Sequence, residues 1–517
     1  MSTTPESDDT NATPQTPLAE IRAQRIEKGE RFRSAGQNPY GGRVEALTST
    51  TAARRRYETA GEDEPVAVKL AGRLMSKRDM GKSCFCDLRD QSGRMQIYAQ
   101  KNRLGEEPFT LFKSLDIGDI IAVEGEVFTT RTEEVTVKAD GFRLLSKSLR
   151  PLPEKWHGLT DVQQRYRQRY LDMISNPEVR DRFVLRTQIV REVRRFLDER
   201  AYVEVETPML QPIPGGAAAR PFETFYHALD CPMYMRIAPE LYLKRLLVGG
   251  LERVYEVNRN FRNEGLSRNH NPEFTMLELY EAYGDCRTMM ETVESLIVAV
   301  ADRVVGTRVI PVGDREIDLN PPWRRVPYAD LIVERMGSEW YELPTKEKAL
   351  RARELELNIS DEMTDAEITH EVYEKVIEHT LIQPTFVTRL PVELVPLAKS
   401  CEDDPGVVDV FELEINGCEI SPGYSELNDP LEQRRRFDQQ SGGETAADSG
   451  AIDEDFLTAL EHGMPPAGGA GVGIDRLLML MLNVPTIRDV ILFPQLRPTE
   501  SAGAQPQQEA PEKAEQS

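Results

Sequence analysis

The sequence has no long apolar run. No stretch of about 18 apolar residues occurs along the chain, whereas a membrane-spanning helix needs about 20. The opening stretch, MSTTPESDDTNATPQTP, also lacks the basic start and the apolar core of a signal peptide. These absences argue against a spanning helix and predict a cytoplasmic location.

Cysteine is scarce as well. Six cysteines occur in 517 residues, and only Cys84 and Cys86 lie close together. The single residue between them suits no standard zinc knuckle. We therefore expect reduced thiols and no disulfide framework.

The chain also lacks an excess of positive charge, since its formal net charge is −23. Such a field repels a phosphate backbone and argues against indiscriminate nucleic-acid binding. Residues 66–150 differ, because they hold 15 Lys and Arg against 12 Asp and Glu, a net of +3. Any nucleic-acid contact is therefore expected to be local.

What is present is typical of a globular α+β protein with two or three domains, since 39% of the residues are hydrophobic and 29% are charged. The polar ends, residues 1–16 and 501–517, lack any apolar pattern, and we expect disordered tails there. Between them we expect a helical segment (17–64), an oligonucleotide-binding (OB) barrel (65–147), a linker (148–178) and a larger domain (179–500) with a helical insertion around 320–383.

The barrel is predicted from five short strand candidates separated by turn residues. An apolar stretch around Phe109–Leu115 lies between the third and the fourth, where an OB fold carries a helix. The candidates span Val66–Leu74, Ser83–Arg89, Arg94–Ala99, Ile120–Phe128 and Glu134–Leu144.

Two side chains of this barrel are candidates for reading an unpaired base, Phe85 by stacking and Gln96 by hydrogen bonding. A phenylalanine on a strand is more often a core residue, and a glutamine is more often simply solvated. Nearby basic residues favour nucleic-acid binding without deciding between these alternatives: Arg73, Lys77, Arg78 and Lys82.

The linker begins at RPLPE (150–154), because two prolines two positions apart break both ladders and helices. The following QQRYRQRY predicts a basic linker helix. Its basic face is either solvated or in contact with RNA.

Residues 255–280 alternate with period two on both sides of a polar loop, which predicts two antiparallel strands. Each strand then has one polar face, formed by Glu256, Asn258, Asn260 and Arg262 on the first and by Phe274, Met276, Glu278 and Tyr280 on the second. A guanidinium for phosphate, a ring for base stacking and carboxylates for ammonium predict a site for a phosphorylated, planar and partly cationic ligand pair. A solvated hairpin with an ordinary polar face is the alternative.

A second hairpin is predicted around the Asn-Gly dipeptide at 416–417. A two-residue loop pairs Glu414 with Glu419 and Glu412 with Ser421, which puts all three glutamates on one face. Like charges across a ladder destabilise it unless they are neutralised, and a hard divalent cation with phosphate oxygens would do so. An acidic hairpin splayed in water is the alternative.

Other segments supply further candidates. A long amphipathic helix, Phe183–Glu199, leads into a strand that stops at Pro208, and the loop Gly215–Arg220 is made of small residues. A helix begins at Pro239, where the macrodipole alone explains the glutamate that follows. Residues 282–400 are predicted to be mostly helical and without chemistry, with a strand at 383–388 and with His370 and His379 on the surface.

The last candidate is a glycine-rich approach to an apolar helix, with Arg476 in its first turn. The Lys-Ser/Thr ending of a Walker loop is absent. An arginine directed from a helix start suits a phosphate tail.

Together these blocks resemble a class II aminoacyl-tRNA synthetase of the aspartate, asparagine and lysine subclass, specifically the bacterial lysyl-tRNA synthetases, over residues 18–500. The first family motif is matched by the helix and strand ending at Pro208, the second by FRNE and HNPEF within 261–274, and the third by GVGIDR (471–476). KWHGL (155–159) and YSELNDP (424–430) also match this subfamily.

The resemblance implies a lysine–tRNA ligase that uses ATP and Mg²⁺ to convert L-lysine to lysyl-adenylate and passes the lysyl group to tRNA(Lys). It further implies a catalytic sheet of six or seven antiparallel strands, a homodimer built on the first motif, and an anticodon-binding barrel.

The resemblance also assigns roles to matching residues. Arg262 and Arg476 would be catalytic, because they offset the charge that accumulates as pyrophosphate leaves. ATP would be bound by Arg262, Glu264, His270, Asn271, Phe274 and Arg476. Lysine would be bound by Gly216, Glu240, Arg262, Glu278, Tyr280 and Glu426, Mg²⁺ by Glu412 and Glu419, and anticodon bases by Phe85, Gln96 and Glu134.

Two positions depart from the family pattern. Pro422 stands where many members carry an asparagine that touches the substrate carboxylate, and Asn269 stands where some relatives have Arg or Thr. Two alternatives share much of the pattern: an enzyme that lysylates a protein, whose relatives lack the barrel, and a non-catalytic regulator, which would not need the intact charged residues of the site.

Overall fold

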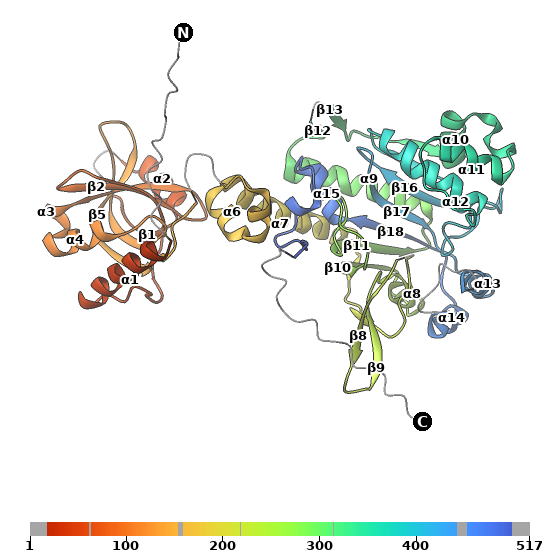
Figure 1. Ribbon diagram of the computed structural model, residues 1–517, viewed down its shortest axis with the longest axis horizontal. Helices are drawn as coiled ribbons and strands as arrows, with labels where there is room; N and C mark the ends of the chain where they lie inside the picture. Colours follow the sequence, from red (N-terminus) through yellow and green to blue (C-terminus); the bar gives the residue numbers. More distant parts are fainter. Residues whose placement is uncertain are drawn as a thin grey trace, which may run out of the picture. The chain divides into compact units, whose positions relative to one another are not determined.

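The computed structural model describes residues 18–61, 64–153, 159–217, 219–313, 315–441 and 452–498. The chain divides into two compact units, unit 1 (Met1–Thr160) and unit 2 (Asp161–Ser517) (Figure 1). The predicted disordered tails and most of the KWHGL motif lie outside the described residues. Among the helices that are described, none is both long enough and apolar enough to cross a membrane.

Among its described residues, unit 1 contains a closed barrel of five strands in the order β1-β2-β3-β5-β4, as predicted (Figure 1). Buried residues alternate with partly exposed ones along β2, so one face of the strand fills the barrel. The strands are β1 (Ala67–Asp79), β2 (Ser83–Arg89), β3 (Arg94–Gln100), β4 (Ile120–Thr129) and β5 (Val135–Ser146).

Helices pack against the core of this barrel. The predicted helix between β3 and β4 is α4 (Glu106–Ser114), and the predicted N-terminal helix is α1 (Leu18–Ser34), whose Phe32 is buried in the barrel core. The prediction misses the short α3 (Lys101–Leu104) and α2 (Thr50–Thr59). Helix α2 begins after Ser49, whose side chain accepts a hydrogen bond from the Ala52 N–H at 3.3 Å.

The predicted basic linker helix is two short helices, α5 (Val162–Arg167) and α6 (Arg169–Ser175), and both belong to unit 2. Arg169 is fully buried, forms an ion pair with Asp172 at 2.8 Å, and donates to the carbonyl oxygen of Leu492 at 3.0 Å. The expectation of a linker with a solvated or RNA-contacting face is therefore wrong at Arg169, because this guanidinium satisfies buried backbone carbonyls.

Unit 2 is built on a sheet with eight strands among the described residues, in the order β14-β15-β16-β17-β18-β11-β10-β6. The expectation of six or seven antiparallel strands is wrong at the edges, where β6 and β14 each pair in parallel with a neighbour. These strands of two and four residues are too short to give a period-two signal. The bounds are β6 (Val203–Glu204), β10 (Arg253–Phe261), β11 (Glu273–Ala282), β14 (Arg324–Pro327), β15 (Thr385–Thr388), β16 (Val410–Glu414), β17 (Glu419–Ser425) and β18 (Ala467–Gly473).

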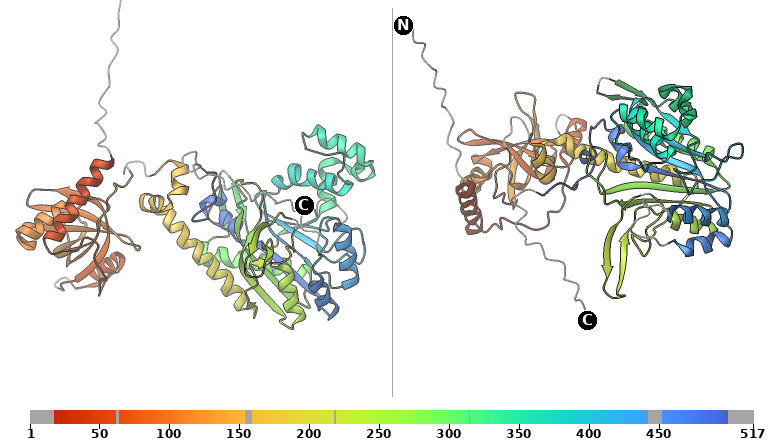
Figure 2. Two further views of the ribbon diagram at one scale, coloured as in Figure 1. Left: turned by 60° about the horizontal axis from the view of Figure 1, so that its bottom comes forward. Right: turned by 45° about the vertical axis from the view of Figure 1, so that its right-hand side comes forward.

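Helices α7 (Pro177–Asp198), α9 (Cys286–Val300) and α15 (Ile474–Met481) pack against one face of this sheet (Figure 2). Leu277 and Leu279 of β11 are buried in that apolar layer. Strand alternation therefore turns Glu278 and Tyr280 to the opposite face, as predicted. One face of the sheet builds the core, and the other carries the polar groups.

The acidic hairpin forms at the predicted Asn-Gly turn, whose two residues have φ angles of 58° and 65°. Glu414 pairs with Glu419, as predicted. Glu412 pairs with Pro422 instead of Ser421, so this part of the prediction is wrong. The register shifts beside Glu414, which is the signature of a β-bulge, and a bulge leaves no mark in the apolar pattern.

The predicted helical insertion holds α10 (Tyr328–Met336), α11 (Thr345–Glu354) and α12 (Asp365–Val372), packed around an aromatic core of Tyr328, Trp340 and Tyr373. The prediction misses the hairpin of β12 (Val309–Val312) and β13 (Arg315–Asp318) before it. His379 is exposed, as expected, whereas His370 is partly buried with its ring stacked on Tyr373.

The rest of unit 2 flanks the polar face of the sheet. Helix α8 (Glu240–Val248) begins directly after Pro239 and packs against α14 (Glu454–Glu461). A small sheet of β7 (Leu210–Gln211), β9 (Cys231–Met235) and β8 (Phe222–Tyr226) precedes α8, and α13 (Pro430–Ser441) begins at the last residue of the sequence YSELNDP. All six cysteines have free thiols, as predicted.

Candidate active site

The candidate site lies over the polar face of β11, β17 and β18. Along β18, glycines alternate with apolar residues of the core. Gly469 lies in register between Tyr280 of β11 and Tyr424 of β17. A Cβ atom at Gly469 would collide with the Glu426 carboxylate and the Tyr280 ring. The glycine-rich strand is thus a flat floor that lets the flanking side chains converge.

Three carboxylates meet above this floor: Glu240 from α8, Glu278 from β11 and Glu426 directly after β17. Each of these residues is at most 5% exposed. The Tyr280 hydroxyl donates to Glu278 at 3.1 Å, and the Tyr424 hydroxyl donates to Glu240 at 2.6 Å. Burial raises the pKa of Glu278 to about 8, and repulsion from Glu240 adds to the rise. Burial likewise raises the pKa of Glu426 to about 8. The pocket therefore favours a bound cation.

A lysine of the chain reaches two of these carboxylates. Lys244 is fully buried; its Nζ donates to Glu240 at 2.7 Å and forms an ion pair with Glu426. Burial alone would lower the pKa of Lys244, but the Glu240 and Glu426 carboxylates raise it above its usual value. The ammonium is therefore charged inside the pocket.

The small-residue loop approaches α8 closely, as its composition predicts. Gly216 has a φ of 86°, and a Cβ atom there would lie 3.1 Å from the Cβ of Glu240. The backbone of this loop therefore borders the carboxylate cluster, which places Gly216 beside Glu240 as the prediction requires.

Arg262 and Phe274 lie at the edge of the cluster. The Arg262 guanidinium carbon is 5.2 Å from the centroid of the Phe274 ring. Its Nε is buried without a hydrogen-bond partner among the described residues, and its charge lowers the pKa of Glu278, in opposition to burial. A buried, unsatisfied guanidinium N–H is a ready donor to an anion.

Arg476, His270 and Glu419 form a chain of polar contacts. Arg476 donates to the Glu419 backbone carbonyl at 2.7 Å and lies 3.1 Å from His270 Nε2. Burial and the neighbouring Arg476 lower the pKa of His270, so the ring is neutral and Nε2 accepts from the guanidinium. The ring proton is then on Nδ1, which donates to Ser267 Oγ at 2.8 Å.

The two remaining predicted ATP residues differ from these. Asn271 is buried, with its amide donating to the Glu273 carbonyl at 2.5 Å and its oxygen accepting from the Gln495 N–H at 3.2 Å. Asn271 therefore ties the loop to the segment after α15. Glu264 is exposed close to His270, whose pKa its charge raises.

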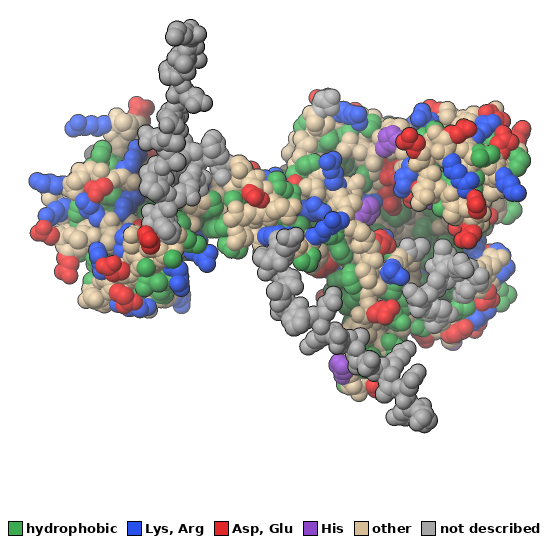
Figure 3. All heavy atoms as spheres, in the orientation of Figure 1, with side chains coloured by type: hydrophobic (Ala, Val, Ile, Leu, Met, Phe, Trp, Pro, Cys, Tyr) green, Lys and Arg blue, Asp and Glu red, His purple; other side chains and the backbone are tan. Residues whose placement is uncertain are grey.

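The glutamates of the acidic hairpin lie beside two more from the helical insertion. Burial and repulsion from Glu419 and Glu378 raise the pKa of Glu412 well above its usual value. Glu414 is 1% exposed, and its Oε2 has no hydrogen-bond partner within the described ranges. Such hard oxygen donors fit a divalent cation, although no three of the described His, Cys, Asp or Glu side chains converge as a metal cage. Figure 3 shows unit 2 hollowed beside the insertion, with acidic side chains at the edge.

In unit 1 the predicted base-reading residues lie on the neighbouring strands β2 and β3 and directly before β5. Phe85 stacks on Tyr98, directly opposite in the ladder, with 4.5 Å between ring centroids. Gln96 is buried, and its carbonyl oxygen accepts from the Thr136 hydroxyl at 3.0 Å. Glu134 pairs with Arg94 at 3.1 Å. The two partly exposed rings form the surface of this group.

The predicted basic cluster around Phe85 is divided by the structure. Arg73 donates to the Gly118 carbonyl at 2.8 Å, and Lys77 donates to the Lys113 carbonyl at 2.6 Å. These two cations support the backbone near α4. Arg78, directly opposite Phe85 in the ladder, and Lys82 are exposed.

Two family models match the chain. Residues 161–497 match the model described as tRNA synthetases class II (D, K and N), where the letters are amino-acid codes. Residues 68–145 match an OB-fold nucleic acid binding domain. The first match covers more than half of the chain. This protein belongs to the class II tRNA synthetases.

Curated relatives resemble this synthetase along almost its whole length. The lysine–tRNA ligase of Pelotomaculum thermopropionicum is 54% identical, over 93% of this chain and 96% of the relative. The lysine–tRNA ligase of Halalkalibacterium halodurans is 50% identical, over 94% of this chain and 98% of the relative. That of Bacillus subtilis is also 50% identical, over 92% of this chain and 96% of the relative.

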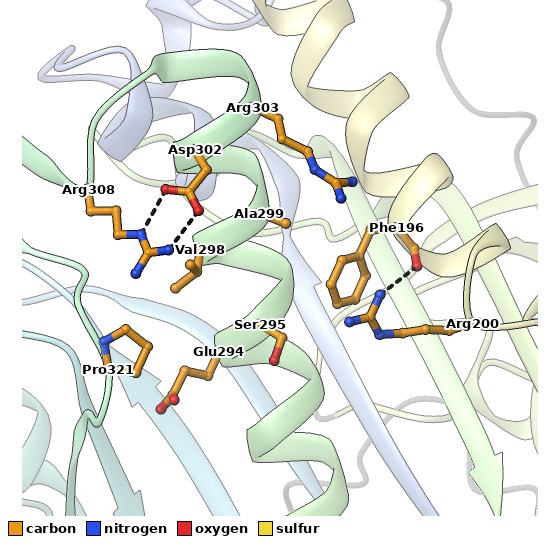
Figure 4. A pocket seen from close by; sticks show the side chains of 10 residues that line it. All are labelled: Phe196, Arg200, Glu294, Ser295, Val298, Ala299, Asp302, Arg303, Arg308 and Pro321. Atoms are coloured by element: carbon orange, nitrogen blue, oxygen red, sulfur yellow. Dashed lines mark hydrogen bonds and ion pairs between the residues drawn. The ribbon is translucent and has the colours of Figure 1, made fainter.

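A cavity of about 330 Å³ in the synthetase unit lies away from these residues, between α7 and α9 on the helix-covered face of the sheet (Figure 4). Its charged side chains are already paired. Arg308 makes two hydrogen bonds to Asp302, each 2.8 Å long, and Arg200 donates to the Phe196 carbonyl at 3.2 Å. The cavity therefore offers little to a charged substrate.

The prediction omitted several residues that shape the synthetase site. Lys244 lies four positions after Glu240, a spacing that puts both on one face of a helix. Tyr424 lies two positions before Glu426 on a strand, and Tyr98 two after Gln96, so period two marks both. Gly469 carries no such signal, because its role depends on which strands flank it.

Proposed function

We propose that this synthetase is a lysine–tRNA ligase, which activates L-lysine with ATP to give lysyl-adenylate and passes the lysyl group to tRNA(Lys), with release of pyrophosphate and AMP. One observation carries the proposal: Glu240, Glu278 and Glu426 are buried together beside Arg262. The names of the curated relatives support the same activity.

The amino acid is selected by charge. Gly216 and Glu240 receive the α-ammonium, and Glu278, Glu426 and Tyr280 receive the side-chain ammonium. A neutral amino acid would leave buried carboxylates unpaired, and aspartate would be repelled by Glu278. Discrimination therefore comes from the cost of leaving these acids without a cation.

Adenylation needs no side chain as a general acid. The carboxylate oxygen of lysine attacks the α-phosphorus in line, and pyrophosphate leaves. Arg262 bridges the carboxylate and the α-phosphate. Phe274 stacks on the adenine, and Glu264 accepts from its amino group. Arg476 and His270 hold the outer phosphates, and Asn271 keeps the loop that carries them in place.

Mg²⁺ supplies charge neutralisation at the phosphate oxygens when it is bound. Glu412 and Glu419 would hold it, because both carboxylates belong to the acidic cluster. Two carboxylates would suit Mg²⁺, which proteins usually bind through one or two carboxylates together with substrate phosphates.

Pro422 offers no donor to the substrate carboxylate, where many family members have an asparagine. Its ring lies beside Gly471 on the floor, and the backbone pairs with Glu412. Recognition of the carboxylate is therefore left to Arg262, which fits its unsatisfied Nε.

The barrel gives the enzyme its tRNA specificity. Phe85, Gln96 and Glu134 read anticodon bases, and Tyr98 extends the stacking surface. The barrel favours tRNA over a protein acceptor, since a protein-lysylating relative has no use for it. The ligase functions in the cytoplasm as a homodimer built on the α7 region. Its functional parts are a helical segment (17–64), the barrel (65–147), a linker (148–178) whose helices α5 and α6 pack with the catalytic unit, and a catalytic domain (179–500), between two tails.

The test is amino-acid-dependent exchange of pyrophosphate into ATP, measured without tRNA for each of the twenty amino acids. We expect exchange with lysine alone. Exchange with another amino acid and none with lysine would refute the assignment of substrate. Transfer to tRNA(Lys) is then measured by acid-stable lysyl-tRNA formation, with a barrel-deleted chain as control.

A further inference from the structure

We infer that Lys244 sets the charge and the geometry of the amino-acid pocket, as a positioning residue that holds Glu240 and Glu426 for a substrate with two ammonium groups. This inference rests on the proposed function and goes beyond it, because Lys244 touches the carboxylates and not the substrate.

The first argument is the charge count. When all three are ionised, Glu240, Glu278 and Glu426 contribute three negative charges, and Lys244, which pairs with Glu240 and Glu426, returns one positive charge. The pocket is thus left with two net negative charges. Lysine carries two ammonium groups, and Arg262 is available for its carboxylate. Glu256, whose charge also acts on Glu278, is paired with Arg236 at 2.8 Å and does not enter the count.

The second argument is orientation. Lys244 contacts Oε2 of Glu426, while Oε1 of the same carboxylate is the atom nearest the open side of Gly469. The Oε2 atom of Glu426 is therefore held by Lys244, and the Oε1 atom lies over Gly469 in the floor of the pocket. Lys244 and the Tyr424 hydroxyl also both donate to Oε1 of Glu240, which leaves its Oε2 for a ligand.

The third argument is the absence of water screening. Lys244 is fully buried on α8, with its Nζ 5.5 Å from the centroid of the Tyr424 ring. A lysine loses much solvation energy in such a place and is retained only with close partners. A neutral residue of similar volume at this position would leave three carboxylates facing one another, and protonation of one of them would relieve the repulsion.

The experiment compares Lys244→Met, which removes the charge at similar volume, with Lys244→Gln, which retains a hydrogen-bond donor, and Lys244→Arg, which retains the charge. Lys348→Met is the matched control, because Lys348 of α11 is also buried and pairs with Asp365 of α12 at 2.8 Å. Pyrophosphate exchange gives KM for lysine and for ATP, and thermal unfolding gives stability.

Both neutral variants should raise KM for lysine by about 10- to 100-fold and change KM for ATP by less than about threefold. They should also shift the pH dependence of kcat/KM for lysine to higher pH. Lys244→Arg should stay closer to the parent than either neutral variant, and Lys348→Met should lower only the unfolding temperature.

The inference is overturned if the neutral variants keep the parent KM for lysine and its pH profile, or if KM for lysine and ATP rise together. Should Lys244→Met not fold, Lys244→Gln decides by the same criteria. A parent protein without lysine-dependent exchange would instead refute the proposed function, so the two failures are distinguishable.

Discussion

The two units present their candidate binding groups in different ways. In unit 1, the rings of Phe85 and Tyr98 are partly exposed on a barrel whose core lies beneath them. In unit 2, Glu278 and Glu426 are 5% and 1% exposed and have strongly raised pKa values. A surface of rings can stack on bases of a large, flexible polymer at low electrostatic cost, whereas buried charges discriminate strongly among small ligands.

This comparison predicts that single substitutions in unit 2 have larger effects than those in unit 1, and that the effects separate by assay. Pyrophosphate exchange without tRNA reports on unit 2 alone. Aminoacylation reports on both units.

The largest effect is expected for Arg262→Ala. Loss of this guanidinium should lower kcat for exchange by about 100- to 1,000-fold, because it removes a preorganised donor to the reacting phosphate. Arg325→Ala is the control, since Arg325 also lies over a phenylalanine ring, at 5.9 Å, but on β14. Equal losses in the two variants would contradict the role of Arg262.

Glu278→Gln should come next, with KM for lysine about 10- to 100-fold higher in the exchange assay and KM for ATP little changed. The amide cannot neutralise an ammonium. It is also a weaker hydrogen-bond acceptor for the Tyr280 hydroxyl than the carboxylate is. Glu281→Gln is the matched control on the same strand, because Glu281 faces away and pairs with Arg253 at 2.6 Å. A smaller effect at position 278 than at 281 would refute the carboxylate assignment.

The pH dependence of lysine activation should follow the same acids. A carboxyl with a pKa of about 8 binds an ammonium only when ionised, so kcat/KM for lysine should rise about tenfold between pH 7 and pH 9 for each of the two acids that must ionise. In the absence of lysine, these raised pKa values favour the folded state below about pH 4.5, and that contribution is lost as the pH rises through about 8. A flat profile over this interval would show that neither acid titrates there.

Phe85→Ala should weaken the use of tRNA and leave exchange intact. KM for tRNA(Lys) should rise about five- to tenfold, the lower part of the range for base stacking, because the Tyr98 ring remains. Tyr40→Ala serves as the control, since Tyr40 is an exposed aromatic residue of unit 1. Loss of exchange in Phe85→Ala would show that the ring supports the fold and not the anticodon.

The smallest effect is expected in the basic cluster of unit 1, where the exposed cations should behave differently from those that donate to backbone carbonyls. Arg78→Ala should weaken tRNA binding about twofold and reduce its salt dependence by about one phosphate contact. Lys77→Ala should instead lower the unfolding temperature, because it removes hydrogen bonds to backbone carbonyls. Filter binding at several salt concentrations measures the first effect, and thermal unfolding measures the second. The reverse pattern would contradict the division of the cluster.

Period-two alternation predicted the faces of β11 and the location of the barrel strands, because one buried face imposes that pattern on each strand. Period-two alternation failed where the structure has an irregularity that leaves no pattern in the sequence. The bulge beside Glu414 moves Glu412 from Ser421 to Pro422, and no residue in the hairpin marks it. Strand β6 was missed for a different reason, since its two residues are too few to show alternation.

Charged residues were harder to place than apolar ones. Arg169, Arg73 and Lys77 all look like surface or nucleic-acid cations in the sequence, yet each donates to backbone carbonyls. A charge is retained inside a fold when its partners are close, and those partners come from distant parts of the chain.

By itself the sequence determined the two-part organisation, the faces of its long strands and the residue types of the site. It could do so because burying one face of an element produces a periodic pattern of apolar residues within that segment. Only the tertiary structure decided that Lys244 returns one positive charge to the glutamate cluster and that Gly469 leaves space for Glu426. Electrostatic pairing and close approach depend on distances between segments far apart along the chain, and local sequence does not encode those distances.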